Sequence, residues 1–169
     1  LSSDTLGSRS VALGYFALKS QNFTSATDSY NTALGFAAGR DTTTGTNNTF
    51  IGGLSGDANT TGGSNVAVGR ASFSDNTTGS NNVAIGDAAL NSNTTGDNNV
   101  SVGKNSLLLN DTGFQNTAVG TSALYSNTTG LRNTSIGYES LDANTTASDN
   151  TAIGRAALGA NTTGANNIA

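Results

Sequence analysis

Carboxylates are the side chains of this sequence best able to do chemistry, because its 169 residues include neither His nor Cys. Enzymes that cleave polysaccharides hold two carboxylates on either side of the bond to be broken. The eleven acidic residues here are scattered and form no recurring pair, as Asp57, Asp111 and Glu139 illustrate. A serine nucleophile would lack a histidine base. We therefore do not expect an enzyme.

Asparagines in the pattern Asn-x-Thr offer a second chemistry, because this tripeptide is the acceptor for N-linked glycans. The pattern recurs at Asn59, Asn76, Asn93, Asn110, Asn127, Asn144 and Asn161. The other explanation is turn formation, since Asn and Thr side chains bond readily to nearby backbone. We favour turn formation and keep glycosylation as the alternative.

Composition narrows the function further. The net charge is −4, with seven basic residues, so there is no electrostatic footprint for nucleic acid or an anionic membrane. No apolar run is long enough to span a bilayer. The absence of His and Cys removes the commonest metal ligands, and we expect no metal site and no cofactor.

A tandem repeat organises the chain. Seven consecutive intervals of 17 residues follow a first interval of 21 between the glycines Gly14, Gly35, Gly52, Gly69, Gly86, Gly103, Gly120, Gly137 and Gly154. We number the repeat from Asn116 as position 1, so these glycines are position 5. We expect residues 1–30 to form an irregular first coil, with a four-residue insertion bulging within Gln21–Ser29 as a cap or junction. Residues 31–169 would form the regular part, whose last coil is incomplete, so the chain could be an excerpt.

The repeat predicts an all-β fold, a parallel β-solenoid (β-roll or β-helix) with one 17-residue coil per repeat. Frequent glycine disfavours helices. Positions 1–4 would be a strand, the glycine of position 5 a bend with positive φ, and positions 7–10 a second extended piece. The Asn-Thr-Thr-Gly at positions 12–15 would be a turn with a left-handed glycine. About nine coils stacked ~4.8 Å apart would give a rod of about 40–45 Å, with asparagines forming ladders.

Uncharged residues at adjacent strand positions suggest burial on both faces, because neighbouring side chains point in opposite directions. We expect the larger residues of positions 4 and 9 to form the core: Val68, Ile85, Val102, Val119, Ile136, Ile153, Leu90, Leu107, Leu124, Leu141 and Leu158. The small residues of position 3 would form a homotrimer interface, intertwined or side by side: Ala67, Ala84, Ser101, Ala118, Ser135 and Ala152. The alternative is that the small column lines a very narrow interior of a monomer.

Two coils break the pattern at position 9, where Gly39 and Gly56 replace leucine. An unfilled core is destabilising, so we expect Phe36, Phe50 and Leu54 to occupy the vacated space.

The phrases NTAVGTSALYSNTTG and NTAIGRAALGANTTG resemble the repeat of phage tail fibre proteins and related tail-fibre-domain surface proteins. They are more distantly similar to the head repeats of trimeric autotransporter adhesins. The resemblance covers about residues 31–169. It implies a homotrimeric, fibrous, extracellular part of a virion tail fibre or a bacterial cell surface. Such a shaft or spacer would support host attachment, with a host-surface glycan or protein as receptor.

Two other features leave alternatives open. Threonine columns at positions 13 and 14, with a third at position 2 interrupted by Val66, Val83 and Val100, suggest a monomeric solenoid that orders water or ice, or binds carbohydrate. Aromatic residues gather in the first fifty residues, where they would form either a contact site or a cap on the solenoid: Tyr15, Phe16, Phe23, Tyr30, Phe36 and Phe50.

Overall fold

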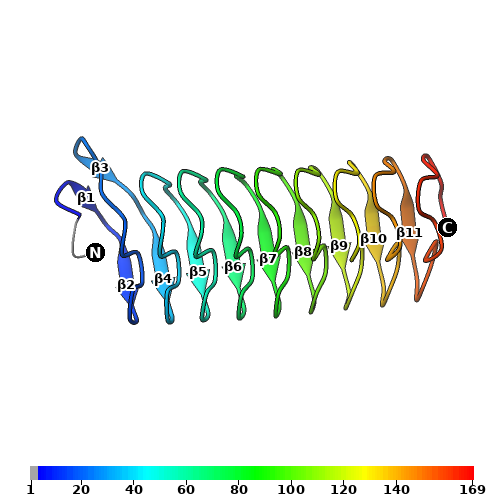
Figure 1. Cartoon of the computed structure of the whole chain (residues 1–169), viewed down its shortest axis with the longest axis horizontal. Coiled ribbons are helices and arrows are strands. Elements are labelled where there is room, and N and C mark those ends of the chain that lie inside the picture. Colours follow the sequence, from blue (N-terminus) through cyan, green and yellow to red (C-terminus); the bar gives the residue numbers. More distant parts are fainter. Residues whose placement is uncertain (1–3) are drawn as a thin grey trace.

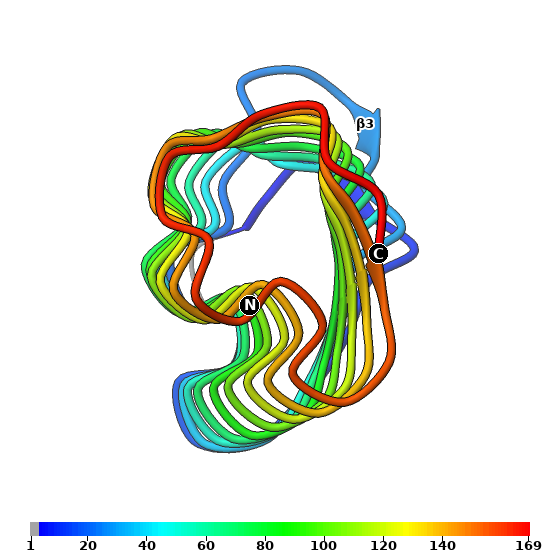
Figure 2. The same ribbon diagram turned by 90° about the vertical axis from the view of Figure 1, so that its right-hand side faces the viewer.

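The computed structural model describes residues 4–169 as a parallel β-solenoid whose coils stack along one axis (Figure 1). Residues 4–169 contain strands and turns and no helix. Nine short strands form one parallel sheet in chain order: β2 (Val11–Leu13), β4 (Thr32–Leu34), β5 (Thr49–Ile51), β6 (Val66–Val68), β7 (Val83–Ile85), β8 (Val100–Val102), β9 (Thr117–Val119), β10 (Thr134–Ile136) and β11 (Thr151–Ile153). The sheet forms one wall of the coil seen end-on in Figure 2.

The strand register repeats the sequence period. Ala118 of β9 pairs with Ser135 of β10, which is 17 residues later, and the same offset holds from β4 to β11. Between β2 and β4 the offset is 21, with Val11 paired to Thr32. The extra length projects from the first coil, where β3 (Thr27–Asp28) pairs with β1 (Gly7–Ser8) in a second, two-stranded sheet (Figures 1 and 2). Residues 1–3 of the predicted first unit lie outside the described residues.

The glycine that closes each strand takes a positive φ, as the sequence predicted. At Gly86, φ is 136°, and a Cβ there would lie 2.6 Å from the carbonyl oxygen of Gly103 in the next coil. Both the bend and the close stacking of coils therefore require glycine at position 5.

Two predictions about the rest of the coil were wrong. Positions 7–10 form a turn, not a second strand. The residues at positions 7 and 9 have left-handed backbone conformations, as at Ser122 (φ 56°) and Leu124 (φ 52°). The glycine of Asn-Thr-Thr-Gly is not left-handed, and that conformation falls at position 17, for example at Gln115 (φ 59°). Gly113 is needed for space instead, because a Cβ there would lie 2.6 Å from the carbonyl oxygen of Gly130.

The interior of each coil is narrow. Positions 3, 8 and 9 point into it, and Ala118, Ala123 and Leu124 are completely buried there within a single chain. The leucine column lies in this core as predicted, with Leu90, Leu107, Leu124 and Leu141 buried and Leu158 half-buried in the last coil. One large residue per coil fills the space, so the residues opposite it must be small.

The assignment of the two strand faces was therefore inverted. The predicted interface column is buried inside the coil: Ala67, Ala84, Ser101, Ala118, Ser135 and Ala152. The predicted core column at position 4 faces outward, with Val68, Val102 and Val119 half-buried and Ile85, Ile136 and Ile153 exposed. The alternative, a narrow interior lined by the small column, describes the structure.

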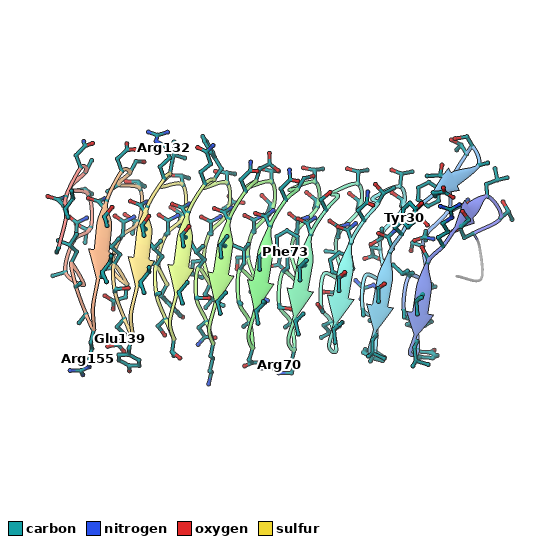
Figure 3. The ribbon with its side chains drawn as sticks, turned by 180° about the vertical axis from the view of Figure 1, so that it is seen from behind. Tyr30, Arg70, Phe73, Arg132, Glu139 and Arg155 are labelled. Atoms are coloured by element: carbon teal, nitrogen blue, oxygen red, sulfur yellow. The ribbon has the colours of Figure 1, made fainter. Side chains whose placement is uncertain are left out.

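The space left by glycine at position 9 in two coils is filled by one side chain, that of Phe50 in the coil that contains Gly56. Phe50 at position 3 is completely buried, and a Cβ on Gly39 would lie 2.7 Å from its ring. Phe73 is also buried and replaces leucine at position 9 (Figure 3). Phe36 does not take part, because its side chain is exposed, and Leu54 is only half-buried.

Candidate functional site

The outer side of the nine-stranded sheet is the most distinctive surface of the molecule. Strand alternation sends positions 2 and 4 outward, since position 3 points inward. We call this surface the outward face, and none of its residues is charged: Val11, Leu13, Thr32, Leu34, Thr49, Ile51, Val66, Val68, Val83, Ile85, Val100, Val102, Thr117, Val119, Thr134, Ile136, Thr151 and Ile153. All are half-buried or exposed.

The outward face is continuous along the rod and carries no charge. It consists of Val, Ile, Leu and Thr in two columns that run the length of the rod. With strands about 4.8 Å apart and three residues long, its area is about 400 Å². This is within the range of the largest apolar patch on a typical monomer, a patch that is often functional. This surface was not predicted from the sequence. Comparing positions 3 and 4 does not show which other residues lie on the same side of the strand as position 4.

The asparagines of the Asn-x-Thr pattern belong to the interior. Asn110 donates from Nδ2 to Asn93 Oδ1 (2.8 Å) and to the carbonyl oxygen of Gly113 in its own turn (2.9 Å). The same arrangement leaves six of the seven candidate acceptors completely buried: Asn59, Asn76, Asn93, Asn110, Asn127 and Asn144. Asn161 in the last coil is half-buried. Their nitrogens are occupied and enclosed in the folded chain, which supports turn formation.

A second asparagine ladder runs beside the first, at position 1. Asn116 donates from Nδ2 to the carbonyl oxygen of Gly130 (2.8 Å), and its Oδ1 accepts from the backbone N–H of Asn133 (3.0 Å). From Asn31 to Asn133, each position-1 side chain ties its own strand to a turn of the same coil and to the next coil.

The threonines of positions 13 and 14 differ in how free their hydroxyls are. At position 13 the hydroxyl is used between coils, as where Thr60 donates to the carbonyl oxygen of Thr77 (2.8 Å). At position 14 the threonines are exposed, for example Thr61 and Thr78. The position-13 hydroxyls are therefore engaged between coils. On the sheet, the regular array of side chains that faces solvent is the outward face.

Five of the eleven acidic residues form ion pairs with arginines. Arg40 contacts Asp41 (2.8 Å) and Asp57 (3.3 Å), and its hydrogen bond to Asp41 raises its pKa. The pKa of Asp75 is raised, first by partial burial and then by the negative charge of Asp57. Within residues 4–169 we find no group of three or more acidic residues placed to hold a metal ion and no ligand-sized pocket. The same part of the chain has no helix of the length and apolarity needed to cross a bilayer.

Aromatic residues at the N-terminal end are buried or exposed, and the exposed Tyr30 lies beside Arg9, apart from the other exposed rings. Phe23 and Phe50 are buried. Tyr15, Phe16 and Phe36 are exposed by 67%, 37% and 55%, and we call these three the aromatic corner. Tyr15 lies 3.9 Å from Phe16 and stacks on Phe36 at 6.0 Å between ring centroids.

Comparison with protein-family models, curated proteins and solved structures found no match to this chain.

Proposed function

We propose that this chain is a segment of the shaft of a fibre, most simply a homotrimer, that supports attachment to a host or another surface. The repeat's resemblance to phage tail fibres and trimeric adhesins suggests an extracellular place, on a virion or a bacterial surface. The observation that carries the proposal is the outward face, an uncharged apolar surface that runs along all nine strands of the sheet.

A second copy of the chain is the partner that fits this surface. The outward face presents a ridge at every strand, at the fixed spacing of a parallel sheet. A partner must repeat at the same spacing to contact every coil, and another copy does so by construction. Copies aligned in parallel would place their Val, Ile and Leu side chains together and remove them from water, which stabilises the assembly.

The rod itself is suited to a mechanical role. From the coil of residues 48–64 to that of residues 150–166, consecutive coils are bonded by strand pairs and by both asparagine ladders. Any receptor contact would belong to variable, exposed positions or to other parts of the fibre, with a host-surface glycan or protein as the ligand.

Sedimentation equilibrium tests the assembly. We expect the purified segment to associate, most simply as a trimer, and Val119→Glu to dissociate it while circular dichroism stays unchanged, because the charge would lie within the apolar contact. Thr121→Glu, at an exposed position two residues beyond the same strand, is the control and should leave association intact. A wild-type chain that stays monomeric at high concentration would contradict the proposal.

A monomer that orders water or ice is the second candidate, favoured by one observation. Five strands of the sheet present Thr at position 2 and Val, Ile or Leu at position 4 on the same flat face: β4, β5, β9, β10 and β11. Such a regular array of hydroxyl and methyl groups could match a water lattice. A monomer with measurable thermal hysteresis, abolished by Val119→Glu, would replace the fibre proposal with this one.

A further inference from the structure

The aromatic corner is the point at which one row of the repeat departs from its usual chemistry. Tyr15 and Phe36 occupy position 6 in the first two coils, whereas later coils have residues such as Arg70 or Asp87 there. Figure 3 shows Arg70 and Arg155 of this row at the lower turns, pointing away from the rod. The two aromatic rings stack with an interplanar angle of 16° although both are exposed, so they present a preformed apolar surface.

The aromatic corner adjoins the two leucines of the outward face. Leu13 and Leu34, which are exposed by 66% and 44%, precede Tyr15 and Phe36 by two residues in the same coils. Among residues 4–169, Lys19 is the charged residue that lies over one of these rings, with its Nζ 4.5 Å from the centroid of Phe16. A sugar needs hydrogen-bonding side chains beside the ring on which it stacks. Besides Lys19, the corner adjoins Leu13 and Leu34 of the outward face, and these apolar neighbours favour a protein surface.

The area of the outward face explains why such an extension is needed. Stable protein interfaces bury about 800 Å² on each partner. The outward face offers only about 400 Å². Aromatic side chains contribute about 150–250 Å² each when fully buried, so three half-exposed rings add a substantial part of what is missing.

We propose that the aromatic corner packs against a second copy of this chain and fixes the copies in parallel, in-register alignment. This inference rests on the proposed fibre function, since the partner is the same copy that covers the outward face. Parallel, in-register copies bring the apolar ends of both chains together. A copy shifted by three coils would set the rings near Arg70 and Asp87, and an antiparallel copy would set Tyr15 near Arg155 and Phe36 near Tyr138. Both alignments would bring charged side chains to the rings and separate the two aromatic corners.

The test compares two changes at the same repeat position. In Tyr15→Ser/Phe36→Ser we expect the dissociation constant of the oligomer, measured by sedimentation equilibrium, to rise at least about tenfold, as for interface residues of this type. The matched control is Tyr138→Ser, which removes an exposed position-6 ring from a distant coil and should leave the constant within about twofold. Circular dichroism and thermal unfolding confirm that each variant is folded.

The outcomes separate this inference from the proposed function. If the wild type associates and Val119→Glu dissociates it, but the serine variant associates normally, the fibre proposal stands and the role of the corner is overturned. If Tyr138→Ser weakens association equally, the role of the corner is also overturned, because any exposed aromatic ring at position 6 would then contribute to association. If the serine variant loses binding to a glycan array while its association is unchanged, the corner is a sugar-binding site and the proposed role in alignment is overturned. A monomeric wild type overturns both proposals.

Discussion

The asparagines in the middle of the position-12 ladder, from Asn76 to Asn144, use both atoms of the amide. As at Asn110, the nitrogen donates to the previous coil and to the turn of its own coil, while the oxygen accepts from the next coil. Buried polar groups are costly unless bonded, so a ladder of this kind is stable only when its members are continuous. A residue other than Asn at position 12 of one coil leaves a donor or an acceptor of the ladder without a partner.

The ladder has such a defect at Thr42. This residue stands at position 12 in the coil before Asn59, and its buried hydroxyl oxygen has no hydrogen-bond partner. Asn59 consequently donates only to Gly62 in its own turn. Thr42→Asn should extend the ladder by one member and stabilise the fold by about 1 kcal/mol, measured by urea unfolding. Thr44→Asn, at an exposed position of the same turn, should change little. Destabilisation by Thr42→Asn would contradict this account of the defect.

At the scale of the element, each coil encloses a narrow interior, and the parallel sheet forms one wall of it. The wall needs a small residue at position 3 because position 9 of the same coil already fills the interior, as Ala118 and Leu124 show. The glycine at position 5 then turns the chain sharply enough for coils to stack with their backbones in contact. The outward side of the wall carries no such restriction within the chain, so its uniform Val, Ile, Leu and Thr composition calls for an explanation outside the chain.

The inversion of the strand faces gives a sharp prediction for neighbouring residues. Ala118→Glu buries a charge with no partner inside the coil and should destabilise the fold by several kcal/mol, or prevent folding. Val119→Glu places the same charge on the outward face and should leave the monomer folded. Thermal unfolding followed by circular dichroism distinguishes them. Similar melting temperatures for the two variants would show that the interior is not where the structure places it.

At the scale of the whole molecule, stability is built from contacts between consecutive coils. Such repeat proteins behave approximately as one-dimensional stacks, in which each unit contacts only its neighbours. The strand contacts follow this rule within the described residues, since every paired strand of the main sheet is the neighbour in chain order.

One whole coil should therefore be removable. Deletion of residues 99–115 removes one full repeat and joins Asn98 at position 17 to Asn116 at position 1, so we expect a folded rod shorter by about 4.8 Å. Small-angle X-ray scattering measures its length, and circular dichroism its fold. Deletion of 99–107 instead removes β8 and Leu107 and joins position 17 directly to position 10, so we expect it to disrupt folding. Equal tolerance of both deletions would contradict the in-register stack.

The sequence by itself determined the period, the parallel solenoid, the positive φ at position 5 and the asparagine ladders. These features are local or follow from strict repetition, because identical residues 17 apart can stack only if each coil lies on the next. The leucine core at Leu90, Leu107, Leu124 and Leu141 was predictable for the same reason.

Only the tertiary structure decided which side of the strand is the inside. Alternation shows that positions 3 and 4 point in opposite directions, but it does not say which of them shares an interior with the leucine of position 9. That depends on the width of the tube, which is set by the left-handed residues at positions 7, 9 and 17, such as Ser122, Leu124 and Gln115. A tube that narrow holds Ala118 and excludes Val119, so the larger column is left outside, where the proposed partner binds.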